Sequence, residues 1–192
     1  MLTSAILEAW TSEFALATVT NRNVKQPIIS LSETPYAALD IANDNPRSLE
    51  EELLARLAAA QRELSLVSMH LTANFREGTM RQIRQLLVPE FWDEEDAHLN
   101  MVSFRSFARA MAALRPAIRP MLGLSDRGHI LAMWGSEATR LSFEHLENDE
   151  LRWSIFNKDV NGRDTAAGTT SVARISRIID AHGVGELLHG AR

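Results

Sequence analysis

Residues 129–157 read HILAMWGSEATRLSFEHLENDELRWSIFN. Two clusters of turn-forming residues, at 135–138 and 147–150, divide this stretch into three runs that are rich in β-branched and aromatic side chains. Runs bounded by such clusters are typical of β-strands. The stretch therefore predicts a three-stranded antiparallel β-meander, and the rest of the chain is interpreted around it.

The alternation of side chains predicts how the second and third strands pair. Alternate residues of a strand share a face, and each of these strands has one apolar face (Leu141, Phe143 and His145; Leu151, Trp153 and Ile155). We expect Phe143 to pair with Trp153. The same register places Glu144 opposite Arg152 on the other face, which we expect to be solvated. A slip of one residue would bury Glu144 in the core, so the register is strongly specified.

Composition and periodicity predict the fold class. The chain has 192 residues, 45% hydrophobic residues, a net charge of −5 and no cysteine. Three strands with one apolar face need helices to cover them. We therefore predict an α+β fold with a helical N-terminal half, the three-stranded antiparallel meander and a C-terminal helix packed on the sheet. One domain would span 48–192, with helices in 48–115, the meander in 129–157 and the last helix in 171–182.

The N-terminal residues 1–47 have a different pattern. Ile6, Trp10 and Phe14 recur every four residues and predict a short amphipathic helix. Residues 18–47 contain three prolines and predict a mobile linker. The helix would either dock on the protein's own core or bind in a groove of a partner protein.

Ser48 begins the folded part, because Ser48 and Glu51 have the spacing of a capping box. The helix that follows, to about residue 70, carries an apolar stripe of period near 3.5. Its members are Leu57, Ala60, Leu64, Val67 and Leu71. This stripe predicts either self-association through Leu57, Leu64, Val67 and Leu71 or packing on a second helix, expected at 79–87 after an interruption at 74–78.

The following segments are predicted from caps and prolines. Ser103 is expected to cap a helix over 104–114, and Pro116 and Pro120 then lead the chain to the meander. Residues 158–169 are polar and contain glycine, so a loop is expected there. Ser171 or Thr170 would cap the last helix, and Gly183 would close it in the left-handed conformation.

One region is rich in arginine and lacks acidic residues. Between residues 97 and 125 the charged side chains are Arg105, Arg109, Arg115 and Arg119. Such a segment predicts a patch for phosphate, nucleic acid or an acidic partner. The alternative is that these arginines pair with the acidic residues at 90 and 93–96, which are close in sequence.

Motifs that define a chemistry are absent from the sequence. It contains no HExxH, no phosphate-binding glycine loop and no G-x-S-x-G. His98 follows the acidic residues 93–96, but a solvated helix start explains these acids without a metal, and His145 is expected in the core. We predict no catalytic residue, no metal site and no cofactor. No stretch is apolar for long enough to cross a membrane.

These observations favour a small cytoplasmic protein-interaction or regulatory protein without catalytic activity, of the kind represented by antitoxins or inhibitor subunits. Its partner would be another protein, bound through the N-terminal segment and the helix that starts at Ser48, and it could form a homodimer. The alternative is a nucleic-acid-binding protein that uses the segment from Arg105 to Arg119. An enzyme of another type is a third hypothesis.

Overall fold

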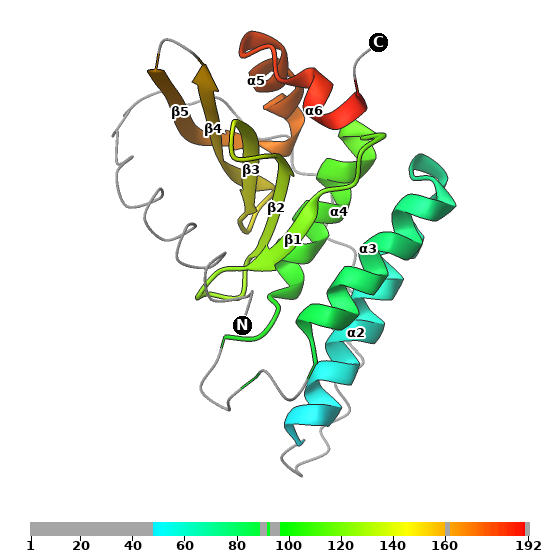
Figure 1. The fold of residues 1–192 in the computed structure, drawn as a ribbon. Coiled ribbons are helices and arrows are strands. Elements are labelled where there is room, and N and C mark those ends of the chain that lie inside the picture. Colours follow the sequence, from blue (N-terminus) through cyan, green and yellow to red (C-terminus); the bar gives the residue numbers. More distant parts are fainter. Residues whose placement is uncertain (1–47, 89–91, 93–96, 160–161, 191–192) are drawn as a thin grey trace, which may run out of the picture. The chain divides into compact units, whose positions relative to one another are not determined.

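The computed structural model describes residues 48–192, apart from 89–91, 93–96, 160–161 and 191–192. In this part of the chain helices come first, an antiparallel sheet follows and short helices end the fold (Figure 1). The helices before the sheet are α2 (Leu49–Leu66), the 3-10 turn η1 (Ser68–His70), α3 (Ala73–Leu86) and α4 (Met101–Leu114). The chain is thus an α+β protein, as predicted. The predictions for Ile6, Trp10 and Phe14 and for the linker at 18–47 lie outside the described residues.

The sheet has five strands, so the prediction of three is wrong. They are β1 (Met121–Leu124), β2 (Ile130–Gly135), β3 (Thr139–His145), β4 (Glu150–Asp159) and β5 (Gly162–Ser171), in the order β1-β2-β3-β4-β5. The expected loop at 158–169 is largely β5, which pairs with β4 along ten positions. Its composition, GRDTAAGTTS, has weak strand propensity, and pairing with a long neighbouring strand overrides that propensity.

The predicted register of β3 and β4 is confirmed. Phe143 pairs with Trp153, and Glu144 pairs with Arg152. The apolar face of these strands continues into β2, where Ile130, Ala132 and Trp134 are buried. One apolar face therefore crosses the three central strands.

The opposite face of the sheet is not solvated at its centre, which corrects the prediction. Glu144 is 5% exposed and Ser142 is 4% exposed. The Glu144 carboxylate accepts a hydrogen bond from Arg152 Nη1 at 2.6 Å and lies 3.0 Å from His129 Nδ1. A buried carboxylate needs such partners, so this face combines cross-strand pairing with a small ionic network.

Helix α4 packs against the apolar face of the sheet and contacts α2 on another side (Figure 1). Phe104 and Phe107 are fully buried. The predicted cap is wrong: Asn100 caps this helix by accepting from two backbone N–H groups. Ser103 instead donates from its hydroxyl to the carbonyl of His145 and accepts from the Ile130 N–H at 2.9 Å. It therefore joins the helix to two strands.

Helices α2 and α3 form a helical hairpin (Figure 1). The capping box at Ser48 is confirmed, with hydrogen bonds in both directions between Ser48 and Glu51. The interruption expected at 74–78 is misplaced, because the chain turns at 67–72 and Thr72 caps α3. Gly78 is buried inside α3, where the guanidinium of Arg119 occupies the space that a side chain would fill.

The apolar stripe of α2 faces the core of the same chain. Ala60, Leu64 and Leu71 are buried, and Leu57 and Val67 are partly buried against them. Their surroundings are provided by α3 and α4. Self-association through Leu57, Leu64, Val67 and Leu71 stays a prediction, and it would require α2 to leave these neighbours.

The chain ends in η3 (Val172–Arg174), α5 (Ile175–Ala181) and α6 (Gly185–His189). The expected cap at Ser171 or Thr170 is wrong, since neither η3 nor α5 has a side-chain cap. Gly183 has a φ of 65°, as predicted for the end of α5. The ring of His182 lies 5.3 Å from that of Trp153, so the end of α5 rests on β4.

Candidate binding groove between α2 and α3

Two of the predicted arginines are paired within the protein. Arg105 Nη2 lies 2.9 Å from a carboxylate oxygen of Glu63 in α2. Arg109 Nη1 lies 2.6 Å from a carboxylate oxygen of Asp149, which precedes β4. The hydrogen bond with Glu63 raises the pKa of Arg105 above its ordinary value. The charge of these two side chains is therefore balanced, by acids that are distant in sequence.

Arg115 and Arg119 lie in other surroundings. Arg115 is in the left-handed conformation at the end of α4, with Nη2 3.3 Å from Nδ1 of His70. Arg119 lies against Gly78 of α3. The structure thus places the four predicted arginines on different neighbours, and binding of nucleic acid through this segment stays a prediction.

A second arginine group lines a hollow between α2 and α3. The hollow has a volume of about 370 Å³. Its wall on α2 is formed by Gln61, Leu64 and Ser65, and its wall on α3 is formed by Arg76, Glu77, Met80, Arg81 and Arg84. We call this hollow the α2–α3 groove.

Helical spacing brings the arginines of α3 to the groove. Residues three and four apart are neighbours on a helix, so Arg76, Met80 and Arg84 follow one another on one side, with Arg81 beside Arg84. Met80 and Leu64 are buried and form the apolar floor. The groove therefore has a floor that belongs to the core and a cationic rim.

The cations of this rim have no acidic partner in the part of the chain that the structure describes. Arg76, Arg81 and Arg84 make none of the ion pairs found there. The Arg76 Nε atom is also buried without a hydrogen-bond partner among the described residues. A buried N–H without an acceptor is unfavourable.

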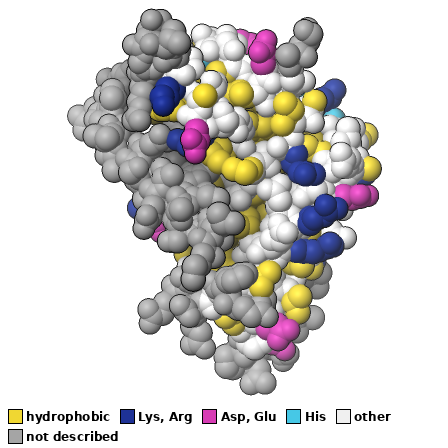
Figure 2. All heavy atoms as spheres, viewed as in Figure 1, with side chains coloured by type: hydrophobic (Ala, Val, Ile, Leu, Met, Phe, Trp, Pro, Cys, Tyr) yellow, Lys and Arg dark blue, Asp and Glu magenta, His cyan; other side chains and the backbone are white. Residues whose placement is uncertain are grey.

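Exposed apolar side chains lie in the connection from α2 to α3. Leu66, at the end of α2, is 76% exposed, and Met69, in η1, is 85% exposed. Both lie near the end of the hairpin at which α2 passes into η1. Figure 2 shows Lys and Arg side chains next to apolar ones on the side of the molecule that carries the hairpin. The hairpin therefore carries cationic side chains in its groove and exposed apolar side chains at its end.

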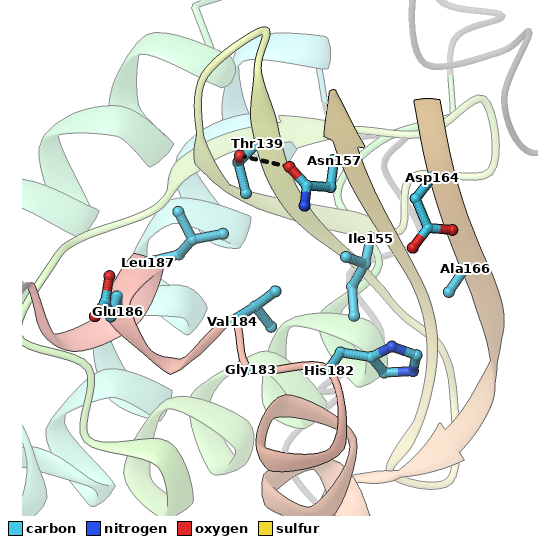
Figure 3. Close-up of a pocket in the computed structure, with 10 residues that line it drawn as sticks. All are labelled: Thr139, Ile155, Asn157, Asp164, Ala166, His182, Gly183, Val184, Glu186 and Leu187. Atoms are coloured by element: carbon cyan, nitrogen blue, oxygen red, sulfur yellow. Dashed lines mark hydrogen bonds between the residues drawn. The ribbon is translucent and has the colours of Figure 1, made fainter. Parts of the chain in front are cut away.

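Another hollow lies at the opposite end of the fold. It has a volume of about 300 Å³ and is formed by the ends of β3, β4 and β5 and the turn between α5 and α6 (Figure 3). The carboxylates of Asp164 and Glu186 line it from different elements. Thr139 donates a hydrogen bond to Asn157 at 3.1 Å on one side of it. Ile155, Val184 and Leu187 supply its apolar lining.

His145 and His98, the two histidines considered in the sequence analysis, each contact other side chains of the protein. His145 is fully buried, and the ring of Phe107 meets it edge-on at 5.2 Å. Burial lowers the pKa of His145 from 6.5 to about 3, so the ring is neutral. His98 Nδ1 lies 3.3 Å from Glu52. Among the described residues no three His, Cys, Asp or Glu side chains are grouped as a metal site requires.

Comparison with family models, with curated proteins and with solved structures gives no match to this chain. The fold itself defines the class, an α+β protein in which helices precede a five-stranded antiparallel sheet. No helix in the described ranges combines the length and apolar character needed to span a membrane.

The sequence held a signal for the α2–α3 groove that the prediction did not use. Arg76, Arg81 and Arg84 share one side of α3 only if the helix starts before Arg76. The predicted interruption at 74–78 removed Arg76 from the helix and so separated these residues. The signal was therefore the combination of the cap at Thr72 with arginines at helical spacing.

Proposed function

We propose that this protein is a non-catalytic protein-interaction or regulatory protein that binds another protein through the outer face of the α2–α3 hairpin. The observation that carries the proposal is that one helical hairpin combines the exposed Leu66 and Met69 at its end with arginines that have no acidic partner among the described residues. Exposed apolar side chains grouped with arginine are typical of interaction sites. A cytoplasmic location and a contribution from residues 1–47, as in an antitoxin or inhibitor subunit, belong to the same proposal.

The test uses the full chain as bait in a nuclease-treated extract of its host. Quantitative mass spectrometry compares the wild type with a variant that carries Leu66→Asp and Met69→Asp. A matched control carries Val102→Asp and Met121→Asp, which are 48% and 52% exposed on other elements. We expect a set of proteins that is retained by the wild type and the control but lost by the hairpin variant. Equal retention by all three baits would contradict the proposal.

A nucleic-acid-binding protein is the second candidate function, and one observation favours it. Arg119 packs against Gly78 of α3, the helix that also carries Arg76, Arg81 and Arg84, so this helix has four arginines on or against it. Affinity for nucleic acid would fall steeply with salt, because bound phosphates release counterions. Binding of single- and double-stranded oligonucleotides at about 50 mM and 200 mM salt decides this alternative. Absence of binding at the lower salt concentration removes it.

A further inference from the structure

We infer that the α2–α3 groove binds an acidic amphipathic segment of the partner protein, with carboxylates on the arginines and apolar side chains on the floor and on Leu66 and Met69. This inference rests on the proposed function, because it names the chemistry of the partner that the hairpin would bind. The inference adds a specific site and a specific ligand class to the proposed function.

The charge of the groove selects an anionic ligand. Three guanidinium groups, of Arg76, Arg81 and Arg84, line a hollow in which Glu77 is the acidic lining residue. Guanidinium groups bind carboxylates through paired, charge-assisted hydrogen bonds. The buried Nε of Arg76 has no acceptor among the described residues.

The apolar part of the site selects a ligand that also has apolar side chains. Leu64 and Met80 form the floor, and Leu66 and Met69 are exposed at the end of the hairpin, where α2 passes into η1. Methionine adapts its shape to different apolar partners. Grooves between helices commonly accept the apolar side of an amphipathic peptide. The expected ligand therefore carries acidic residues on one side and leucine-like residues on the other.

The same features favour a protein over a nucleic acid as the ligand. Protein–DNA interfaces are more polar and more basic than protein–protein interfaces. Here Leu66 and Met69 are among the most exposed large apolar side chains of the described residues, and they belong to the same helical hairpin as the arginines. Binding of an oligonucleotide is therefore an outcome of the test and not the proposal.

Fluorescence anisotropy with the full chain tests the inference. The probe is a short labelled amphipathic peptide with Glu on one side and Leu on the other. A Gln-for-Glu peptide and a Ser-for-Leu peptide are controls, and a labelled single-stranded oligonucleotide is a competing ligand. We expect the Glu–Leu peptide to bind at least about tenfold more tightly than either control peptide, a difference of about 1.4 kcal/mol.

Matched double variants assign the binding to the groove. Arg81→Ala with Arg84→Ala removes two unpaired cations, whereas Arg105→Ala with Arg109→Ala removes two paired ones and changes the net charge equally. We expect the first variant to lose about tenfold or more in affinity for the Glu–Leu peptide. The second should bind as the wild type does.

The inference is overturned if the Glu–Leu peptide fails to bind or if the Gln peptide binds equally well. It is also overturned if both double variants lose affinity alike, or if the oligonucleotide binds more tightly than the peptide.

A charge-swapped pair of variant and peptide controls for a folding defect. The variant Arg81→Glu with Arg84→Glu should bind a Lys–Leu peptide in preference to the Glu–Leu peptide, and the opposite preference contradicts the inference. If the peptide fails while retention of host proteins still depends on Leu66 and Met69, the proposed function stands and this inference alone is discarded.

Discussion

The sheet and the α2–α3 groove differ in whether their polar side chains have partners within the protein. On one face of the sheet, Ser103 of α4 forms hydrogen bonds with two strands. On the other face, Arg152 and His129 contact the Glu144 carboxylate. In the groove, Arg76, Arg81 and Arg84 have no acidic partner in the described part of the chain. In the sheet these polar side chains stabilise the fold, whereas in the groove the arginines are available to a ligand. Substitutions should therefore separate stability from binding.

The largest effect on stability is expected at the centre of the sheet. Phe143 is fully buried, and its ring lies edge-on to Trp134 at 5.5 Å. Phe143→Ala should lower the free energy of unfolding by about 3–5 kcal/mol, since it removes a buried aromatic ring and leaves a cavity. Urea denaturation measures this loss. A loss below about 1 kcal/mol would mean that this position does not belong to a packed core.

A second loss is expected on the other face of the sheet. Arg152→Ala removes one of the two side chains, Arg152 and His129, that contact the buried Glu144 carboxylate. We expect a loss of about 1–3 kcal/mol, more than an exposed ion pair would give. Ser154→Ala, on the same strand and the same face, is the control in the urea experiment. Equal effects of the two substitutions would show that solvent reaches Glu144.

Acid should weaken the sheet through His145. Its pKa is lowered by burial to about 3 in the folded protein, against 6.5 ordinarily. The unfolded chain therefore binds the proton more readily, and stability falls as pH drops from about 6.5 toward 3. Between about pH 7 and pH 5 the wild type should lose about 2 kcal/mol more than His145→Leu. Parallel pH profiles of the two proteins would contradict a neutral, buried imidazole.

The smallest effect on stability is expected in the groove. Arg81 and Arg84 are exposed and unpaired among the described residues, so replacing either with Ala should change the free energy of unfolding by no more than about 0.5 kcal/mol. Thermal and urea denaturation check this for each variant. A large loss would mean that these arginines stabilise the fold as the sheet residues do, and it would contradict the difference between the two regions.

The periodicity of the sequence predicted those parts of the fold in which local pattern and tertiary packing agree. The pairing of Phe143 with Trp153 followed from alternation alone, because a slip would bury Glu144 against the core. The capping box at Ser48 followed from two residues at the correct spacing. Both features depend on neighbours that are close in sequence or on strict alternation.

Other features depend on partners that are distant in sequence, and the pattern did not show them. β5 is a strand because β4 offers it ten paired positions, not because of its own composition. Arg105 and Arg109 have the appearance of a free basic patch until Glu63 and Asp149 are brought to them. Alternation placed Glu144 opposite Arg152 but could not show that Glu144 is buried or that His129 also contacts its carboxylate. Charge in a sequence therefore indicates a binding surface only after its internal partners are known.

The most direct test of the binding groove is site-resolved NMR of the isotopically labelled full chain during titration with the Glu–Leu peptide. The side-chain Nε–H signals of Arg76, Arg81 and Arg84 report on the groove, and those of Arg105 and Arg109 report on arginines that are already paired. The proposed site predicts saturable shifts at the first three, with backbone shifts in α2 and α3 and unchanged signals at the other two. Shifts confined to Arg105 and Arg109, or to the hollow beside α5 and α6, would contradict it.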